Sequence, residues 1–484
     1  MNHDNAWALI QEDIKNKNLI FSVKVTNSSY LRIGGYNARP YSLKLGIGER
    51  LRPSKIKGIL KWWLRVVILG QRNNLPSYKE AEDIINRYYR YLSSDRNEYG
   101  QSKFLLNIKY EIDNEKVDNF RNEIFRMIDD EKYTTKLKEL ESDEKYAKLK
   151  ELDKLKELES IPRIKLILMK RKDEKEYKKE ELSLYPPYTV NVIISFYTKT
   201  KIKTSEEIEM LKTLFGTLIL MLIFQGLSAF SSRGFAGCKL LEIYINSEFQ
   251  NYLNKIYNII NEKIINADKK EKLEEGIKDL INNIINEKKE KLEEGINKSS
   301  RMPEVPTLDA SSNYFVFKVF EVKPGHSPEK ILKIINESVL KSTWKNFDKR
   351  GKPDKYYHTW ILGLPRSQRK TGYIVFEKVV ENNKEIEKKG FRRKSAIGIN
   401  IFETKNKKFV ILHGFKSNDW PVCKKTQDKK LFILKHFSKK GGEEEITKIM
   451  NITDNRKDVA NANAVEEAFN QALDYLERYL KSQL

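Results

Sequence analysis

The chain has 484 residues, of which 33% are charged and 39% hydrophobic, a composition typical of a folded protein with an ionic surface. The chain has 91 Lys and Arg residues and 68 Asp and Glu residues, which gives a net charge of +23. This charge favours nucleic acid as a partner; the alternatives are a membrane surface or the charged surface typical of thermophile proteins. Only Cys238 and Cys423 are present, which excludes a disulfide framework or a cysteine-based zinc site.

The longest apolar run, residues 214–224, is shorter than the roughly 20 residues of a bilayer span and predicts a buried helix. The first residues show no export signal, so we expect an intracellular, cytoplasmic protein without membrane contact. Abundant Lys and Glu with scarce Cys indicate a hot environment, as for an archaeal thermophile.

The first half of the chain has the pattern of one α+β unit. A strand pattern begins at Leu19, a helix follows Pro53, and a long helix covers residues 205–225. Other strand-like runs cover residues 103–112, 161–170, 188–198 and 237–245. This order predicts a split βαβ, ferredoxin-like (RRM-like) unit.

The same order recurs in the second half. A strand at residues 313–322 precedes a helix from Pro328 to about Lys345, and a last helix covers about residues 463–480. The strands between them are expected at residues 371–380, 395–403 and 408–415. The fold class is therefore predicted as α+β, with ferredoxin-like units at residues 1–245 and 313–484 and charged helical insertions.

Two charged segments interrupt these patterns, one near residues 121–160 and one within residues 246–312. KLKELES occurs twice in the first, and EKLEEGI occurs in the second at Glu271 and again at Glu290. Charges four residues apart support exposed helices, so we interpret both as solvated helical insertions. A partner-binding arm is the alternative.

The segment LRPSKIKGILKWWLRV, residues 51–66, holds two adjacent tryptophans that cannot share one helix face. Trp63 belongs to the core-facing stripe, which also contains Ile56, Ile59, Leu60, Leu64, Val67 and Ile68. The other face carries a row of cations with Gly58 and Trp62 alongside, namely Lys57, Lys61 and Arg65. Ser54 is the expected N-cap, with Arg52 just ahead of it.

This outer face is suited to RNA, because cations contact phosphates and an indole can stack on an unpaired base. A helical glycine costs roughly 1 kcal/mol relative to alanine, which indicates close approach of a backbone or a ligand at Gly58. The alternative is that Trp62 packs against a neighbouring domain or subunit while the cations are merely solvated.

The residues RPSKIKGILKWWLR resemble the signature helix of the RAMP superfamily, in particular the first RAMP subunits of type III-B (Cmr) CRISPR effector complexes. Lys61 stands where that pattern prefers Arg. The segment FQGLSAFSSRGFAGCKLLE, residues 224–242, is similar to the glycine-rich loop of the same superfamily, and it places Arg233 beside Gly234. Further basic segments surround Arg32 and Arg39 and, in the second half, Arg366, Arg369, Arg392, Arg393 and Lys394.

The resemblance implies a ribonucleoprotein subunit near the 3′ end of the guide RNA, beside other RAMP subunits, that helps to hold guide and target RNA in antiviral defence. It implies no catalysis and no cofactor. The expected RNA-binding residues are Arg32, Arg39, Arg52, Ser54, Lys57, Gly58, Lys61, Trp62, Arg65, Arg233, Gly234, Arg366, Arg369, Arg392, Arg393 and Lys394.

The sequence offers little for catalysis. Acidic pairs lie in the charged segments, there is no P-loop, and no metal or catalytic site is predicted. The rival hypothesis is a metal-independent endoribonuclease that processes precursor guide RNA, for which His413 is the candidate general base. A third hypothesis is a scaffold held by protein contacts alone.

Overall fold

The structure is a computed structural model. It describes residues 18–32, 41–42, 47–48, 53–72, 78–89, 92, 103–129, 157, 161, 184–198, 200–227, 233–235, 237–289, 302–308, 314–339, 359–364, 366–368, 371–381, 384–389, 393–425, 431–437, 442–449, 452 and 457–484.

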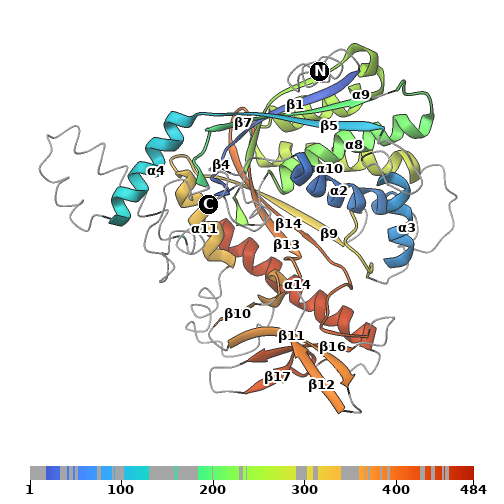
Figure 1. The fold of residues 1–484 in the computed structure, drawn as a ribbon, viewed down its shortest axis with the longest axis vertical. Helices are drawn as coiled ribbons and strands as arrows, with labels where there is room; N and C mark the ends of the chain where they lie inside the picture. Colours follow the sequence, from blue (N-terminus) through green and yellow to red (C-terminus); the bar gives the residue numbers. More distant parts are fainter. Residues whose placement is uncertain are drawn as a thin grey trace, which may run out of the picture.

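One seven-stranded mixed sheet runs through both halves of the chain, in the order β5-β7-β1-β8-β13-β14-β9 (Figure 1). Its strands are β1 (Leu19–Asn27), β5 (Phe104–Ile112), β7 (Val190–Thr198), β8 (Cys238–Ile245), β9 (Phe315–Glu321), β13 (Ile397–Glu403) and β14 (Lys408–Phe415). All neighbours are antiparallel except β8 and β13, which run parallel through the pairs Phe402 with Cys238 and Glu403 with Lys239. The two halves therefore share one backbone hydrogen-bonding network.

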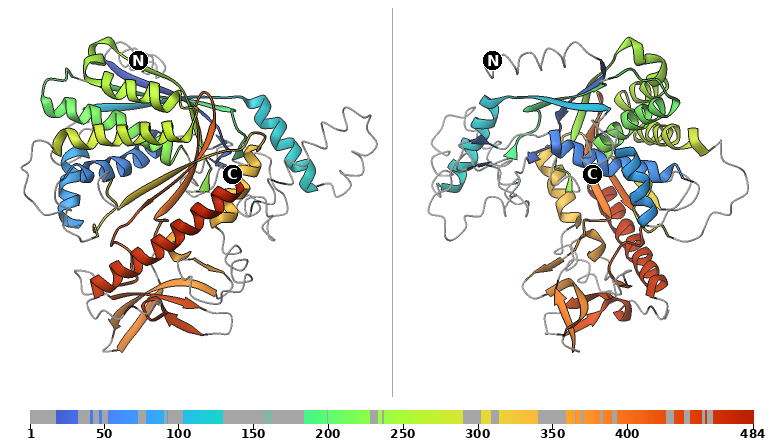
Figure 2. Two further views of the ribbon diagram at one scale, coloured as in Figure 1. Left: turned by 180° about the vertical axis from the view of Figure 1, so that it is seen from behind. Right: turned by 45° about the vertical axis from the view of Figure 1, so that its right-hand side comes forward.

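A layer of helices from the first half packs against one face of this sheet (Figure 2, left). It contains α2 (Pro53–Gly70), α8 (Ser205–Phe224), α9 (Ser247–Ile259) with its π-helical continuation (Ile260–Ile265), and α10 (Lys270–Lys289). Two further helices are α3 (Tyr78–Tyr89), which contacts α2, and α4 (Asn114–Asp129). The predicted buried helix is confirmed, because α8 is buried from Thr213 to Phe224. Among the described residues, no helix is long and apolar enough to cross a membrane.

The second charged segment is helical up to Lys289, as expected, but this part is not simply solvated. Helix α10 includes the first EKLEEGI copy and buries Leu273, Ile277, Leu280, Ile281, Ile284 and Ile285 in the main core. Apolar residues spaced three and four apart form one face among the charges, and this face packs on α2, α8 and β9. The second copy, and most of residues 130–160, lie outside the described residues.

The second half adds another core on the opposite side of β13 and β14. Helices α11 (Pro328–Val339) and α14 (Lys457–Gln483) pack there, and in Figure 1 the long α14 lies between the large sheet and a smaller one. The smaller sheet consists of β10 (Arg366–Gln368), β11 (Thr371–Glu381), β12 (Lys384–Lys389), β15 (Cys423–Lys425), β16 (Leu431–Phe437) and β17 (Glu443–Glu445).

The structure therefore shows an α+β protein, with one correction to the strand assignment. The strand at residues 371–380 exists, but it pairs with β10, β12 and β16 rather than with β13 or β14. Short elements complete the description: β2 (Leu31–Arg32) with β6 (Leu184–Tyr185), β3 (Tyr41–Ser42) with β4 (Ile47–Gly48), a 3-10 turn (Thr359–Leu362) and α13 (Ile446–Ile449). The strand expected at 161–170 falls almost entirely outside the described residues, and the domain boundaries stay a prediction.

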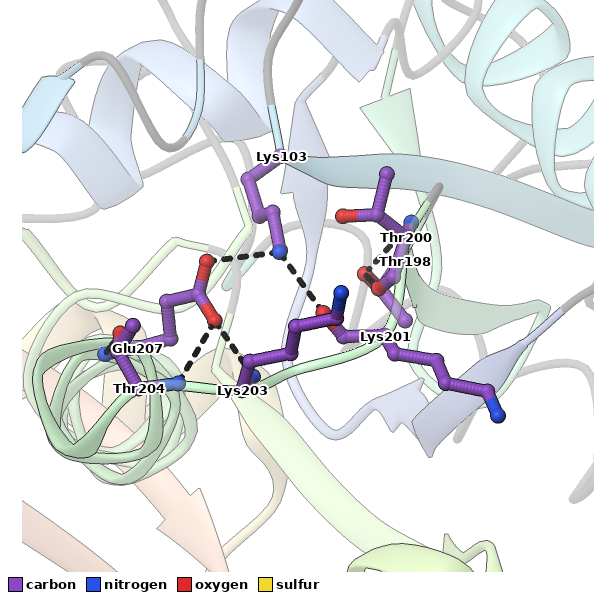
Figure 3. A network of polar contacts seen from close by, with 7 residues as sticks. All are labelled: Lys103, Thr198, Thr200, Lys201, Lys203, Thr204 and Glu207. Carbon is purple, nitrogen blue, oxygen red and sulfur yellow. Dashed lines mark hydrogen bonds and ion pairs between the residues drawn. The ribbon is translucent and has the colours of Figure 1, made fainter.

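A polar network fixes the start of α8 against the start of β5 (Figure 3). The Lys103 ammonium lies 2.7 Å from Glu207 Oε1 and donates to the Lys201 carbonyl at 3.0 Å, while the backbone N–H groups of Lys203 and Thr204 donate to Glu207 Oε2. Thr204 caps α8 by accepting from the Glu207 N–H. One carboxylate thus satisfies free donors of the helix terminus and neutralises a lysine.

We expect Lys103→Met to lower the free energy of unfolding by about 1 to 2 kcal/mol at neutral pH, because a charge-assisted hydrogen bond is lost. Burial raises the pKa of Glu207, but the hydrogen bonds from Lys103, Lys203 and Thr204 outweigh burial and leave it below its ordinary value. The contribution of Glu207 is therefore complete above that value and is lost as the pH falls through the lower folded pKa. Denaturant unfolding measures the free energy of unfolding of both proteins at pH 7 and in mild acid. The difference between the wild type and Lys103→Met should shrink in acid, and a difference that stays constant would contradict this account.

Candidate nucleic-acid interface

Helix α2 positions the residues that the sequence singled out. Pro53 is its first residue, a position that suits proline because its missing N–H would have no partner there. Ser54 therefore lies inside the first turn, and the expectation that it is the N-cap is corrected. The predicted core stripe is confirmed by the burial of Ile56, Leu60, Trp63, Leu64, Val67 and Ile68, whereas Ile59 is half-buried.

The outer face of α2 carries the predicted basic row. Lys57, Lys61 and Arg65 are half-buried, so these like charges are partly withdrawn from water. Burial lowers the pKa of Lys57, because removal from water disfavours its charged form. The buried Nε of Arg65 has no hydrogen-bond partner among the described residues, which is costly for a guanidinium. A negatively charged group beside Lys57 would favour its charged form.

Gly58 lies exposed within this face, between Lys57 and Lys61. A Cβ atom built at Gly58 would have no heavy atom of the described residues within 4 Å, so none of them requires a glycine there. The helix nevertheless carries the cost of a glycine in its second turn. Among the described residues, nothing makes the expected close approach at Gly58.

The two tryptophans have different environments. Trp63 is fully buried, donates its Nε1–H to Gln225 Oε1 at 2.7 Å and stacks on Phe224. Trp62 is half-buried and meets the rings of Trp63 and Phe415 edge to face, with centroid distances of 5.3 and 5.7 Å. Trp62 therefore contacts a strand of the second half, as the packing alternative expected, and it is not a free-standing plate. Phe415 was missed because no local pattern pairs it with α2.

The glycine-rich loop is built into the core where the structure describes it. Arg233 is 4% exposed and donates to the Leu362 carbonyl at 2.8 Å. Gly234 has a φ of 78°, donates its N–H to the Ile399 carbonyl and accepts from Ser29 Oγ at 2.7 Å. These groups bind the two halves of the chain together, and the assignment of Arg233 and Gly234 as RNA contacts stays a prediction.

In the basic clusters of the second half, the structure describes the side chains of Arg393 and Lys394. Arg393 forms an ion pair with Asp419 at 2.8 Å, lies over the Trp420 ring and has a side chain only 16% exposed. Lys394 is exposed, and it remains a candidate. The side chains of Arg32 and Arg366, and all of Arg39, Arg52, Arg369 and Arg392, lie outside what the structure describes. Of those members of the predicted set that the structure describes, only the α2 residues are brought together on one face.

His413 is a core residue. Its ring is buried among Trp63, Phe224 and Phe415, and burial lowers the pKa of His413 to about 3. A general base needs access to substrate and a pKa near the working pH, and His413 has neither in this structure. His436 lies on β16 and His326 in the turn before α11, while His3 and His358 fall outside the described residues. Within the described part of the chain, no group of three or more His, Cys, Asp and Glu side chains is placed to hold a metal ion.

No family model and no curated protein matches the chain. Among solved structures, it is similar to a chain of a type III-B Cmr-beta complex bound to cognate target RNA and AMPPnP in the presence of single-stranded DNA, with 14% identity over 93% of this chain and 99% of that one and a TM-score of 0.46. A second Cmr-beta structure bound to cognate target RNA gives 15% identity over 94% and 100%, with a TM-score of 0.43. Cmr1 from Pyrococcus furiosus in its apo form gives 13% identity over 82% and 87%, with a TM-score of 0.41. Likenesses this distant carry no functional argument.

Proposed function

We propose that the chain is a non-catalytic RNA-binding subunit of a type III-B CRISPR RNA-guided effector complex. In this proposal it is the first RAMP subunit, lies near the 3′ end of the guide RNA beside other RAMP subunits, and helps to hold guide and target RNA in the cytoplasm. The resemblance of residues 52–65 and 224–242 to RAMP motifs supports it. The observation that carries it is the outer face of α2, where half-buried cations lie on both sides of Gly58 and no described atom lies within 4 Å of a Cβ built at that glycine.

The strand order supports the finer assignment of two ferredoxin-like units. Strands β5-β7-β1-β8 are antiparallel neighbours, with α2 between β1 and β5 in the chain and α8 between β7 and β8. This is the β-α-β-β-α-β order of that unit. In the second half, β9, α11, β13, β14 and α14 repeat the order, with three strands in the shared sheet and the smaller sheet inserted.

The roles follow from chemistry and position. Lys57, Lys61 and Arg65 supply charge-assisted contacts to phosphates, and the bare backbone at Gly58 lets a sugar-phosphate chain approach the helix closely. Phosphate binding would compensate the desolvation of Lys57. Trp62, held by Phe415, borders this contact and would stack on a base with its exposed part or meet a neighbouring subunit.

The charge contacts are tested by the salt dependence of single-stranded RNA binding. Lys57→Ala and Lys61→Ala should each reduce the slope of log affinity against log salt concentration by about 0.7, the value for one phosphate contact on a single strand. Lys330→Ala, on the exposed face of α11, is the matched control and should leave the slope unchanged. Equal slopes for the wild type and both α2 variants would refute phosphate contact at α2.

Gly58→Ala separates binding from stability. We expect it to raise the free energy of unfolding by about 1 kcal/mol, since alanine favours the helix and the site is open. It should nevertheless weaken RNA binding, because the methyl group would occupy the space of the approaching backbone. Denaturant unfolding and RNA titration of one preparation measure both effects, and unchanged RNA affinity would remove Gly58 from the proposed contact.

The absence of catalysis is itself a testable part of the proposal. The purified chain, incubated in EDTA with RNA that contains CRISPR repeats, should leave that RNA intact. Defined cleavage that disappears in a His413→Ala variant would instead support the endoribonuclease hypothesis.

A further inference from the structure

Tyr188 lies in an unusual turn that leads from β6 into β7. It follows Pro186 and Pro187 and has a φ of 62°, in the left-handed region. Turns with proline followed by positive φ normally place glycine or asparagine at this point. A bulky side chain there costs roughly 1 to 2 kcal/mol.

The surrounding chain enforces this conformation. Asn27 is 1% exposed, and its carbonyl accepts from the Tyr188 N–H at 2.7 Å. The Asn27 side chain accepts from the N–H groups of Thr189 and Val190 at 3.1 and 2.8 Å and donates to the Pro186 carbonyl at 2.7 Å. These bonds fix the backbone whatever the residue at 188, so they do not explain why a tyrosine stands there.

The side chain of Tyr188 is both exposed and held. Tyr188 as a whole residue is 42% exposed, and its hydroxyl donates to Glu403 Oε2 at 2.5 Å. Burial and Glu403 raise the pKa of Tyr188, so the hydroxyl stays a donor. The ammonium of Lys408 lies 5.1 Å from the ring centroid, and Lys239 forms an ion pair with Glu403 at 3.0 Å. The cluster thus has two ammonium groups, one carboxylate and an oriented aromatic ring, and it spans β8, β13 and β14.

We propose that Tyr188 is a stacking platform for an unpaired RNA base, with Lys239 and Lys408 contacting the adjoining phosphates. The inference rests on the proposed function, because it adds a second contact to the RNA bound at α2. An exposed ring of fixed orientation loses little conformational freedom when a base stacks on it. The charges of the cluster sum to +1, which suits a phosphate backbone. A protein partner is the competing occupant.

The test uses the full chain and a single-stranded RNA of about 20 nucleotides, long enough for more than one contact. Tyr188→Asn should reduce RNA affinity about tenfold, since a stacked base is lost. The thermal unfolding midpoint should stay unchanged or rise, because asparagine tolerates the left-handed backbone. Tyr188→Phe keeps the ring and should bind RNA within about twofold of the wild type. Tyr252→Ala, at an exposed tyrosine of α9, is the matched control and should leave RNA affinity unchanged.

A second measurement needs no variant at Tyr188. RNA carrying 5-iodouridine, crosslinked to the wild-type chain by light, should form an adduct at Tyr188 that mass spectrometry locates. Wild-type affinity in Tyr188→Asn together with no adduct would overturn the stacking site, while weaker binding by Lys57→Ala and Lys61→Ala would leave the proposed function standing. Loss of a co-purifying protein with RNA affinity intact would assign Tyr188 to a protein interface instead. A wild-type chain that fails to bind RNA would overturn both proposals.

Discussion

Replacing Gly70 with alanine is expected to lower the free energy of unfolding by about 3 kcal/mol or more. Gly70 ends α2, and a Cβ atom there would lie 1.7 Å from the carbonyl oxygen of Leu308 and 3.4 Å from Cδ1 of Ile285. Leu308 cannot simply move away, because it is fully buried and its N–H donates to the Val66 carbonyl at 3.0 Å. The methyl group would therefore push residues 302–308 away from the end of α2, where they pack.

The matched control lies in the same helix. Gly58→Ala makes the same chemical change in open space and should stabilise the protein by about 1 kcal/mol. Denaturant unfolding of the two variants should thus give shifts of opposite sign. If Gly70→Ala were as stable as the wild type, the packing of residues 302–308 on α2 would be refuted.

A histidine in the core should make the protein sensitive to mild acid. Burial lowers the pKa of His413 to about 3, whereas the unfolded chain has the ordinary value near 6.5. Below that value the unfolded state binds a proton that the folded state does not, so stability falls as the pH falls. The loss attributable to His413 is about 2 kcal/mol between pH 7.5 and pH 5, at about 1.4 kcal/mol per pH unit once the unfolded histidine is mostly protonated.

His413→Leu should remove most of this dependence, because leucine keeps an apolar group among Trp63, Phe224 and Phe415 and cannot take up a proton. Burial and the neighbouring Lys330 and Lys323 also lower the pKa of His326, so a smaller slope of the same sign should persist in the variant. The free energy of unfolding is measured at several pH values between 5 and 7.5. Equal slopes in the wild type and the variant would show that folding does not lower the pKa of His413.

The shared sheet bears on how the proposed RNA contact is held. Trp62 of α2 packs on Phe415 of β14, Arg233 donates to the Leu362 carbonyl, and Asn400 of β13 donates to the carbonyls of Leu222 and Ile223 at the end of α8. These contacts keep the outer face of α2 fixed relative to the second half. A rigid support of this kind lowers the entropic cost of binding an extended strand.

The sequence by itself determined the local structure. The spacing of Ile56, Leu60, Trp63 and Leu64 predicted which face of α2 is buried, and the run at residues 214–224 predicted a buried helix. The strands around residues 19–27, 104–112, 190–198 and 238–245 also appear where alternating apolar residues indicated them. These elements are set by periodicity and end signals within one segment, so no distant contact is needed to predict them.

Only the tertiary structure decided which of these elements meet. The parallel pairing of β8 with β13, the separate sheet that takes up residues 371–381 and the burial of one face of α10 each depend on contacts between distant segments. The same is true of the candidate sites: Arg233 and Arg393 read as free cations in the sequence, but their partners Leu362 and Asp419 lie far along the chain or in another loop. The sequence gives the sign of each charged side chain, whereas the exposure of that side chain depends on which other segments pack over it.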